Sequence, residues 1–306
     1  MSRQIPCYPD YVPLNLEHRE ILHPRLSLTA DGVSEFTFAG LYLFRDRYNY
    51  RVSRISIDGG FIISGEQPEH SSHGDRKKTF FMTPCEAPNW DILVSLFETH
   101  DYWKNISESV LSPVQKEFEE RGIVFLEDRN NFDYLYYRKD LAQLTGKKFH
   151  KKKNHVNHFL KTYPNHEQRQ MNAALVPLAI EVLDRWRQNA VLYNDGDYAA
   201  AREALDMFSF FSLQGSLFFV DGKPAAYCLG ESIARGRMFA IHFEKGIDEY
   251  KGIYQFMNKA FAESLPRFFT WINREQDLGD EGLRQSKMTY RPCGFVQKYM
   301  GIKEKS

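Results

Sequence analysis

The stretch that decides the fold of this chain is Trp271-Ile-Asn-Arg-Glu-Gln-Asp-Leu-Gly-Asp-Glu-Gly-Leu-Arg-Gln-Ser-Lys-Met-Thr-Tyr-Arg-Pro-Cys-Gly-Phe295. It follows a short β-prone run, 268–272, and then carries charged side chains of both signs around two glycines. Loops at the ends of buried strands are where binding and catalytic sites are usually built. The alternative is a solvated helix start with acidic residues near its positive end.

Composition limits the classes of protein that fit. The chain has 306 residues, of which 40 are basic and 40 acidic, so its formal net charge is zero. Attraction of the whole chain to nucleic acid or an anionic membrane is therefore not indicated, and any such contact must come from a local patch. Aromatic residues make up 15% of the chain, which favours a well-packed globular protein of one large or two smaller domains.

The four cysteines are far apart in the sequence and form no CxxC pair. We therefore expect free thiols in a reducing compartment and no metal site. The first residues contain no apolar signal segment, and no apolar run reaches the ~18 residues of a membrane span. These observations predict a cytoplasmic protein without a transmembrane segment.

Three regions are expected along the chain. Residues 1–30 contain four prolines and read as an irregular arm. Residues 31–146 are rich in β patterns, mostly within 35–83, where Asp58-Gly59-Gly60 signals a hairpin, and include helices at 89–100 and 113–121. Residues 147–306 form the third region, which begins with a basic helix.

That basic segment, 147–161, contains six lysines, three histidines and no acidic residue. On a helical wheel its apolar residues share one face and its basic residues the opposite face. A solvated helix that joins two domains explains this pattern, and so does a phosphate-binding surface for RNA or a nucleotide. The predicted contacts with such a ligand are Lys147, Lys148, Lys151, Lys152 and Lys153. His155 and His158 lack a nearby carboxylate or cysteine, so a metal site is not expected.

The second half has a different order of predicted helices and strands. Two helices, 171–188 and 198–208, precede a pair of apolar runs joined at Asp221-Gly222. This dipeptide between apolar runs is a strong hairpin signal, because a type I′ turn needs positive φ at both central residues. A strand, a helix beginning at Gly252, a strand, a short helix and a last strand complete the pattern.

This order resembles the acyltransferase fold of the GNAT superfamily. Val220-Asp-Gly-Lys-Pro-Ala-Ala-Tyr227 is similar to the hairpin of that fold, and Tyr290-Arg-Pro-Cys-Gly-Phe295 to its last helix-to-strand connection. The more specific resemblance is to the DUF2156 family, related to the C-terminal domain of phosphatidylglycerol lysyltransferase. It covers most of the chain after about residue 30 and rests on 134–136, 141–159 and 272–284, with Lys287 and Pro292.

The resemblance implies an α+β protein with a tandem GNAT fold, in which mixed, mostly antiparallel sheets are flanked by helices. It also implies kinship with enzymes that move an aminoacyl group from tRNA to a lipid or peptide amine. The acceptor stays open between a lipid and a small molecule.

Acyl transfer needs a base, stabilisation of an oxyanion and an acid for the leaving group. Tyr290 lies where GNAT enzymes often place the acid, and Glu275 and Asp277 are candidate bases at a strand end. Arg284 and Lys287 are three residues apart and share a helix face, from which they could bind a phosphate or the oxyanion. We predict one pocket, with catalytic residues Glu275, Asp277, Lys287 and Tyr290 and substrate-binding residues Asn273 and Arg284.

The donor is predicted from a loop. GNAT enzymes bind the pyrophosphate of acyl-CoA on backbone N–H groups at a helix start, through a glycine-rich loop. The corresponding run, Glu249-Tyr-Lys-Gly-Ile-Tyr254, retains only Gly252 as a cofactor-binding candidate, and Glu249 and Tyr254 are unfavourable there. We therefore expect an acyltransferase without a bound cofactor that uses aminoacyl-tRNA as co-substrate. The alternatives are an acyl-CoA-dependent N-acetyltransferase and a catalytically silent binding module.

Overall fold

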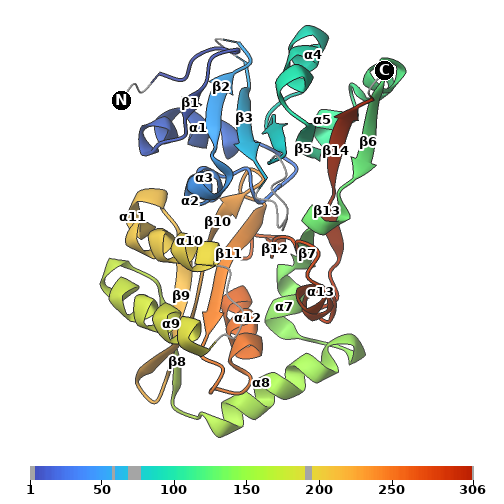
Figure 1. Ribbon diagram of the computed structural model, residues 1–306. Helices are drawn as coiled ribbons and strands as arrows, with labels where there is room; N and C mark the ends of the chain where they lie inside the picture. Colours follow the sequence, from blue (N-terminus) through green and yellow to red (C-terminus); the bar gives the residue numbers. More distant parts are fainter. Residues whose placement is uncertain (1–3, 57–58, 68–76, 190–194, 305–306) are drawn as a thin grey trace. The chain divides into compact units, whose positions relative to one another are not determined.

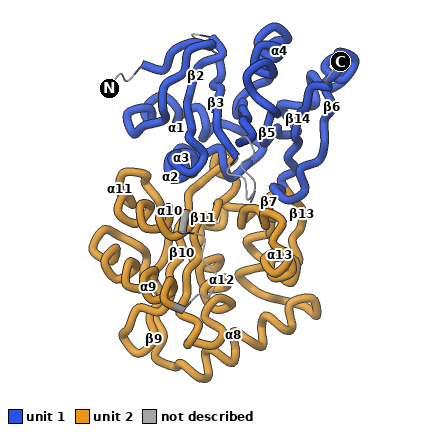
Figure 2. The backbone as a smooth tube through the Cα atoms, in the orientation of Figure 1, with its two compact units in different colours: residues 1–132, 296–306 blue, residues 133–295 orange. Residues whose placement is uncertain are grey.

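The computed structural model describes residues 4–56, 59–67, 77–189 and 195–304. The chain forms two compact units, which Figure 2 shows in different colours. Unit 1 contains residues 1–132 together with 296–306, and unit 2 contains residues 133–295. Each unit is built on one seven-stranded sheet.

The sheet of unit 1 has the strand order β1-β2-β3-β4-β5-β14-β6. Its strands are β1 (Val12–Pro13), β2 (Arg51–Arg54), β3 (Phe61–Glu66), β4 (Thr79–Met82), β5 (Tyr102–Ser107), β6 (Ile123–Glu127) and β14 (Lys298–Lys303). Its helices are α1 (Arg19–Leu26), α2 (Phe38–Leu43), α3 (Arg45–Tyr48), α4 (Trp90–Thr99), α5 (Glu108–Leu111) and α6 (Gln115–Glu120). Helix α4 packs its buried residues Leu93 and Leu96 against the sheet, as the spacing of its apolar residues predicted.

One expectation for this unit was wrong. The start of the predicted β region, 35–83, is helical, because Thr37 caps α2 by accepting a hydrogen bond from the Gly40 backbone N–H at 2.9 Å. An apolar run such as 38–43 fits a buried helix as well as a buried strand, and here the cap decides. Strands β2 and β3 are antiparallel, as the predicted hairpin requires, although residues 57–58 of its turn lie outside the described residues.

The sheet of unit 2 has the order β13-β7-β12-β11-β10-β9-β8. Its strands are β7 (Asp133–Tyr137), β8 (His166–Gln170), β9 (Gln214–Val220), β10 (Lys223–Ile233), β11 (Met238–Gly246), β12 (Trp271–Asn273) and β13 (Gly294–Val296). Its helices are α7 (Arg138–Gln143), α8 (His150–Thr162), α9 (Val176–Asn189), α10 (Asp195–Asp206), α11 (Phe208–Phe211), α12 (Ile253–Ser264) and α13 (Glu281–Met288). Figure 1 shows α9 and α10 on one side of the sheet and α12 on the other.

The predicted hairpin of unit 2 is confirmed: β9 and β10 are antiparallel, and Asp221 and Gly222 have φ of 49° and 76°. The next pair, β11 and β12, is parallel over Met238–Ala240 and Trp271–Asn273, and β11 then runs on to Gly246. The two strands therefore part after Asn273. Unit 1 has the corresponding parallel pair, β4 and β5. The two mixed, mostly antiparallel sheets confirm the predicted tandem GNAT fold.

Unit 1 is made of two separate stretches of the sequence, whereas unit 2 is one continuous stretch. Strand β7 comes before α7, yet it lies between β12 and β13 in the sheet of unit 2. Strand β14, at the other end of the chain, lies between β5 and β6 in the sheet of unit 1. The two units therefore meet in the sequence at 132/133 and 295/296, whereas the sequence analysis placed boundaries at 30/31 and 146/147. Strand β7 and the basic helix both belong to unit 2.

Candidate active site at the end of strand β12

A β-bulge in β11 gives the two faces of the unit 2 sheet different polar residues. Leu229 pairs with Phe243 and Gly230 with Ile241, so that His242 is the extra residue. Beyond the bulge, Glu244 lies opposite Cys228, whose side chain belongs to the core beneath α12; we call this side the α12 face. Glu231 lies opposite Ala240, which belongs to a separate cluster on the second face.

Gly230 makes the bulge possible. A Cβ atom at this position would lie 1.9 Å from the carbonyl oxygen of Ala240. The backbones of β10 and β11 thus approach more closely than any side chain permits.

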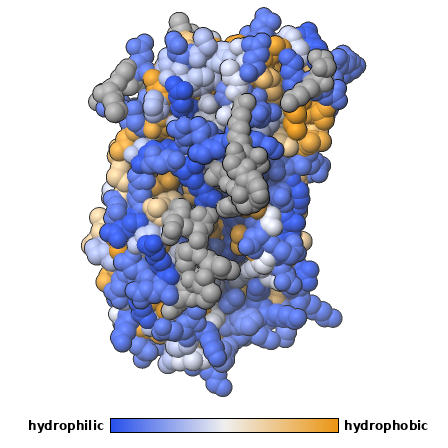
Figure 3. Space-filling model, viewed as in Figure 1, coloured by the Kyte–Doolittle hydropathy of each residue, from blue (hydrophilic) through white to orange (hydrophobic). Residues whose placement is uncertain are grey.

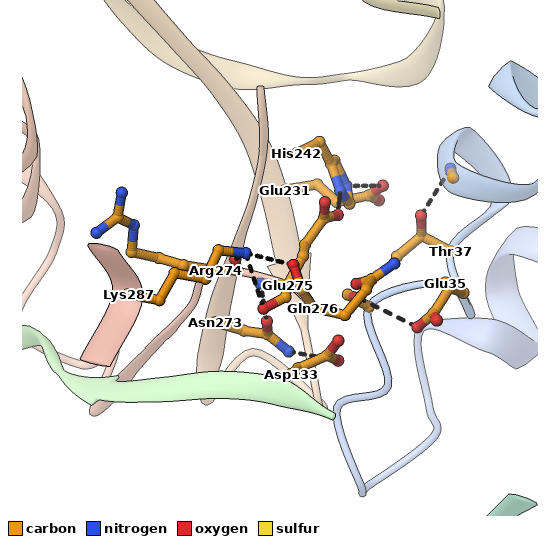
Figure 4. Close-up of polar contacts among 12 residues, drawn as sticks. Glu35, Thr37, Asp133, Glu231, His242, Asn273, Arg274, Glu275, Gln276 and Lys287 are labelled. Carbon is orange, nitrogen blue, oxygen red and sulfur yellow. Dashed lines mark hydrogen bonds and ion pairs between the residues drawn. The ribbon is translucent and has the colours of Figure 1, made fainter. Parts of the chain in front are cut away.

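The second face holds a carboxylate–imidazole–carboxylate cluster (Figure 4). His242 lies between Glu275, whose Oε1 is 2.7 Å from Nδ1, and Glu231, whose Oε1 is 3.1 Å from Nε2. Burial alone would lower the pKa of His242, but its hydrogen bonds to Glu231 and Glu275 and their charges outweigh burial and raise it to about 10. The imidazole is therefore a cation at neutral pH, held between two anions.

Glu275 is positioned by its neighbours at the end of β12. The Asn273 side chain donates to Asp133 at 3.0 Å, and its Oδ1 accepts the backbone N–H of Glu275 at 2.7 Å. Glu275 has φ of 55°, an unusual backbone conformation that these contacts hold. Its side chain is 28% exposed, and its second carboxylate oxygen accepts no hydrogen bond from the part of the chain described. It is the acidic group of this cluster that a substrate can reach.

The α12 face holds a cationic and aromatic cluster. The Arg274 guanidinium donates to Glu244 Oε2 through Nη2 at 2.5 Å and through Nε at 3.2 Å. Its Nη1 is buried and has no hydrogen-bond partner among the described residues. The Arg274 Cζ lies 4.9 Å from the Tyr290 ring centroid, and Lys152 Nζ lies 3.9 Å from the same centroid.

Titration at this cluster follows from burial and charge. Burial, opposed by the charge of Arg274, raises the pKa of Tyr290 to about 12, so its hydroxyl keeps its proton at neutral pH. Burial and Arg274 lower the pKa of Lys152 to about 8. A lysine whose ammonium is partly desolvated and near another cation gains most from an anionic ligand.

Two of the predicted catalytic residues build the loop after β12. Lys287 is buried, and its Nζ donates to the carbonyl oxygens of residues 274, 275 and 276 at 2.6, 3.2 and 2.5 Å. Burial and Arg274 lower the pKa of Lys287 to about 8. The ammonium has three donors and three acceptors, so it holds this loop rather than facing a substrate.

Asp277 is fully buried and is also committed to the loop. It accepts hydrogen bonds from the Tyr134 hydroxyl at 2.6 Å, from the Gly279 backbone N–H at 2.9 Å, and from Arg284 at 3.0 and 2.9 Å. Burial would raise its pKa, but Arg284, Tyr134 and Gly279 together hold it well below its usual range. This geometry favours a structural role for both residues. Asp277 was predicted to be a base, and Arg284 was predicted to bind the substrate.

The basic helix α8 presents one lysine to the α12-face cluster. Lys152 is half-buried beside Tyr290, whereas Lys147, Lys151 and Lys153 are exposed, and Lys148 pairs with Asp140 at 2.7 Å. Figure 3 shows hydrophilic residues over α8, at the bottom of the view. Two features singled out from the sequence, the basic helix and the 271–295 stretch, therefore meet at Lys152 and Tyr290.

Helix α8 also covers the start of α12, where Gly252 lies. Gly252 has φ of 91°, and a Cβ atom there would lie 3.0 Å from the carbonyl oxygen of His155. Glu249 pairs with Arg185 at 3.3 Å, and the Tyr254 hydroxyl bonds the Gly246 backbone. Gly252 thus permits close packing of α8 on the start of α12.

The six residues predicted to line one pocket form two groups. Asn273 and Glu275 lie on the second face, and the remaining four lie on the α12 side or within the loop. The sequence did not indicate His242, Glu231 or Glu244 as site residues. Arg274 lies within the quoted 271–295 stretch, but no role was predicted for it. The one available signal was Gly230 within a strand-like run, since such a glycine often marks a bulge.

The described residues contain neither a candidate metal site nor a candidate membrane span. Among the described residues, no group of three or more His, Cys, Asp or Glu side chains could hold a metal ion. Over the same part of the chain, no helix is long and apolar enough to span a membrane.

Comparison with known proteins identifies relatives of this chain. A conserved protein of unknown function from Bacteroides thetaiotaomicron is 26% identical, with a TM-score of 0.82 over 96% of this chain and 99% of its own. The C-terminal domain (DUF2156) of a putative lysylphosphatidylglycerol synthetase from Agrobacterium fabrum is 11% identical, with a TM-score of 0.58 over 95% and 92%. An uncharacterised protein of Mycoplasmoides gallisepticum is 23% identical over 177 residues, which span 55% of each protein.

The family model described as "Phosphatidylglycerol lysyltransferase, C-terminal" matches residues 26–302. This match and the GNAT fold together support an acyltransferase. The chain belongs to the family of phosphatidylglycerol lysyltransferase C-terminal domains.

Proposed function

We propose that this protein transfers an aminoacyl group from aminoacyl-tRNA to an amine or hydroxyl acceptor, with the reacting groups at the parting of β11 and β12. The observation that carries the proposal is the cluster of Lys152, Arg274 and Tyr290. It joins a helix rich in lysine to a protonated hydroxyl and a buried, unsatisfied guanidinium N–H. Lysines along a helix suit a phosphate backbone, and Lys152 and Arg274 suit the last phosphates before the ester.

The choice of donor rests on the start of α12. In acyl-CoA-dependent GNAT enzymes the backbone N–H groups at this place bind the pyrophosphate. Here the backbone of α8 packs against Gly252, and Glu249 is nearby. The α8 backbone would occupy the space of a pyrophosphate, and the negative charge of Glu249 would repel it. The exposed lysines of α8 offer a polyanion a different route to the same cluster.

The acceptor side is proposed to be the second face. An acceptor amine or hydroxyl attacks the ester carbonyl and loses its proton to the Glu275 carboxylate, whose outer oxygen is accessible. His242, held by Glu231, keeps Glu275 in place. The 3′-oxygen of the terminal ribose leaves with the electron pair of the ester bond and takes a proton from Tyr290, while Arg274 Nη1 stabilises the oxyanion.

The acceptor class is proposed from the family alone. Its name includes phosphatidylglycerol as the lipid and lysine as the transferred group. A lipid headgroup hydroxyl is therefore the first acceptor to test, and a small-molecule amine the second.

The experiment supplies tRNA charged with radiolabelled amino acids to the full chain, together with phosphatidylglycerol vesicles or a mixture of small amines. We expect label to move into one acceptor fraction, with the rate reduced at least about tenfold in Tyr290→Phe and Glu275→Gln. Tyr137→Phe is the matched control, because it removes an exposed hydroxyl. Failure of the native protein to bind tRNA at low salt would overturn the proposal, and so would micromolar binding of acetyl-CoA.

A further inference from the structure

Unit 1 contains a cavity of about 360 Å³ that the proposed function does not use. Its floor is formed by side chains of β2, β3 and β4, where Arg51 lies directly opposite Ser64 and Glu66 opposite Thr79. Ser64 and Glu66 are two residues apart on one strand, so they project from the same face. One wall is the end of α4 at His100, and the other is the N-terminal arm, 8–11.

The arm is fixed in place as a wall. Tyr8 N–H donates to the Arg54 carbonyl at 2.9 Å, and the Tyr8 hydroxyl lies 2.7 Å from Ser95 Oγ. Arg51 Nη2 donates to the Tyr11 carbonyl at 3.1 Å. The arm therefore places two tyrosine rings over the floor, in an edge-to-face pair with centroids 6.0 Å apart.

The centre of the floor is polar but uncharged. His100 Nδ1 lies 3.0 Å from the Leu96 carbonyl oxygen, which can only accept a hydrogen bond, so Nδ1 carries the proton. Nε2 lies 2.8 Å from Ser64 Oγ. Burial lowers the pKa of His100, so the ring is neutral and Ser64 donates to it. The charged groups that line the cavity are then the guanidinium of Arg51 and the carboxylate of Glu66. Glu66 Oε1 accepts a hydrogen bond from Asn49 Nδ2 at 2.9 Å, and Oε2 lies 3.5 Å from Nζ of the exposed Lys77, which a ligand ammonium can replace.

A third feature points to a ligand. The hydroxyl of Tyr11 is buried and has no hydrogen-bond partner in the described parts of the chain. Buried hydroxyl groups are nearly always satisfied in native proteins. The Arg51 Cζ lies 5.8 Å from the centroid of the Tyr11 ring, so both potential donors belong to the same side of the cavity.

We infer that this cavity binds a free amino acid or a zwitterion of similar size. Its carboxylate would be bound by Arg51 and the Tyr11 hydroxyl, and its ammonium by Glu66. Diagonal positions on neighbouring strands are ~7 to 8 Å apart, which side chains of this length can span. The tyrosine rings would cover the carbon atoms of the ligand.

The test measures saturation transfer from the full-length protein to L-alanine, L-lysine and L-phenylalanine by nuclear magnetic resonance. We expect at least one to bind with a Kd of about 1 mM or tighter. Its N-acetyl and carboxamide derivatives, which each lack one charge, should bind at least about tenfold more weakly. Glu66→Gln and Tyr11→Phe should have the same effect, and both preserve the shape of the residue that they replace.

Matched controls separate this site from the rest of the molecule. Glu117→Gln on α6 and Tyr137→Phe change exposed groups of the same kinds and should bind the amino acid normally. Lys152→Ala should also bind it normally, so failure of the aminoacyl-transfer proposal leaves this result intact. Absence of binding by the native protein would overturn the inference, as would equal binding by Glu66→Gln and Tyr11→Phe.

Discussion

Arg274 and Glu275 are adjacent in the chain, yet their side chains pair on opposite faces of one sheet. Arg274 bonds Glu244 on the α12 face, and Glu275 bonds His242 on the second face. Both residues follow the last residue of β12, and Glu275 has φ of 55°. The bulge at His242 places a partner for each of them on the matching face. The end of one strand therefore serves a cationic cluster on one side and an anionic cluster on the other, as Figure 4 shows for the side chains of 274 and 275.

Lys152 should contribute more to polyanion binding than its neighbour Lys151. Lys152 is half-buried beside Tyr290 and Arg274, whereas Lys151 is exposed. Lys152→Ala should weaken tRNA binding and lower the slope of log K against log salt by about 0.7 to 1. Fluorescence anisotropy at several salt concentrations measures both quantities. If Lys151→Ala has the same effect as Lys152→Ala, the lysines act only as a diffuse charged surface.

Asp277→Asn should destabilise the protein. The carboxylate is fully buried and accepts hydrogen bonds from Tyr134, Gly279 and Arg284. An amide keeps the shape but offers N–H groups where acceptors are needed, which should lower the free energy of unfolding by about 2 to 3 kcal/mol. Chemical denaturation measures it. Asp280→Asn is the control, because asparagine also caps helices well. A catalytic Asp277 would instead show lost activity at unchanged stability.

Lys287→Met should also lower stability. Methionine has a similar length but leaves three carbonyl oxygens of residues 274–276 without their donor. The expected loss in the free energy of unfolding is about 2 to 3 kcal/mol, partly offset by the removal of a buried charge. The exposed Lys153→Met provides the comparison. An unchanged melting temperature together with lost activity would favour the catalytic role first predicted for Lys287.

His242 should make the stability depend on pH. Its folded-state pKa is raised from 6.5 to about 10, so its contribution is fully present below pH 6.5 and is lost as the pH rises through 10. The difference in unfolding free energy between the native protein and His242→Gln should shrink by up to about 1.4 kcal/mol per pH unit across this window. Denaturant unfolding at several pH values measures it, with His155→Gln on the exposed face of α8 as reference. A constant difference would contradict a charged imidazole.

Gly252→Ala should disturb the packing of α8 on α12. The residue has φ of 91°, and a methyl group would lie 3.0 Å from the His155 carbonyl. Gly122 has a similar φ of 89° but no atom within 4 Å of an added Cβ, so Gly122→Ala reports the backbone strain alone. We expect both variants to lose about 1 kcal/mol from strain, and Gly252→Ala to lose more and to bind tRNA more weakly. Equal effects in thermal unfolding would show that the close approach does not matter.

Much of the fold follows from local chemistry that the sequence states directly. Asp221-Gly222 specifies a hairpin because both residues tolerate positive φ, and the structure has them at 49° and 76°. The apolar spacing of 89–100 specifies α4, and that of 253–265 specifies α12, because one face of each must be buried. The family resemblance added the tandem arrangement. Each of these signals lies within a few residues of its consequence.

The candidate site depends on contacts between residues far apart in the chain, and only the tertiary structure decided those. Glu275 meets His242, Asp277 meets Tyr134, and Lys152 meets Tyr290, at separations of 33 to 143 residues. Strand β7 pairs between β12 and β13, and β14 pairs between β5 and β6. Such pairing uses backbone hydrogen bonds, which depend little on residue type, so the sequence does not reveal it. The sequence could name charged residues around a strand end. The bulge and the strand order determine which of these residues hold the loop and which can face a substrate.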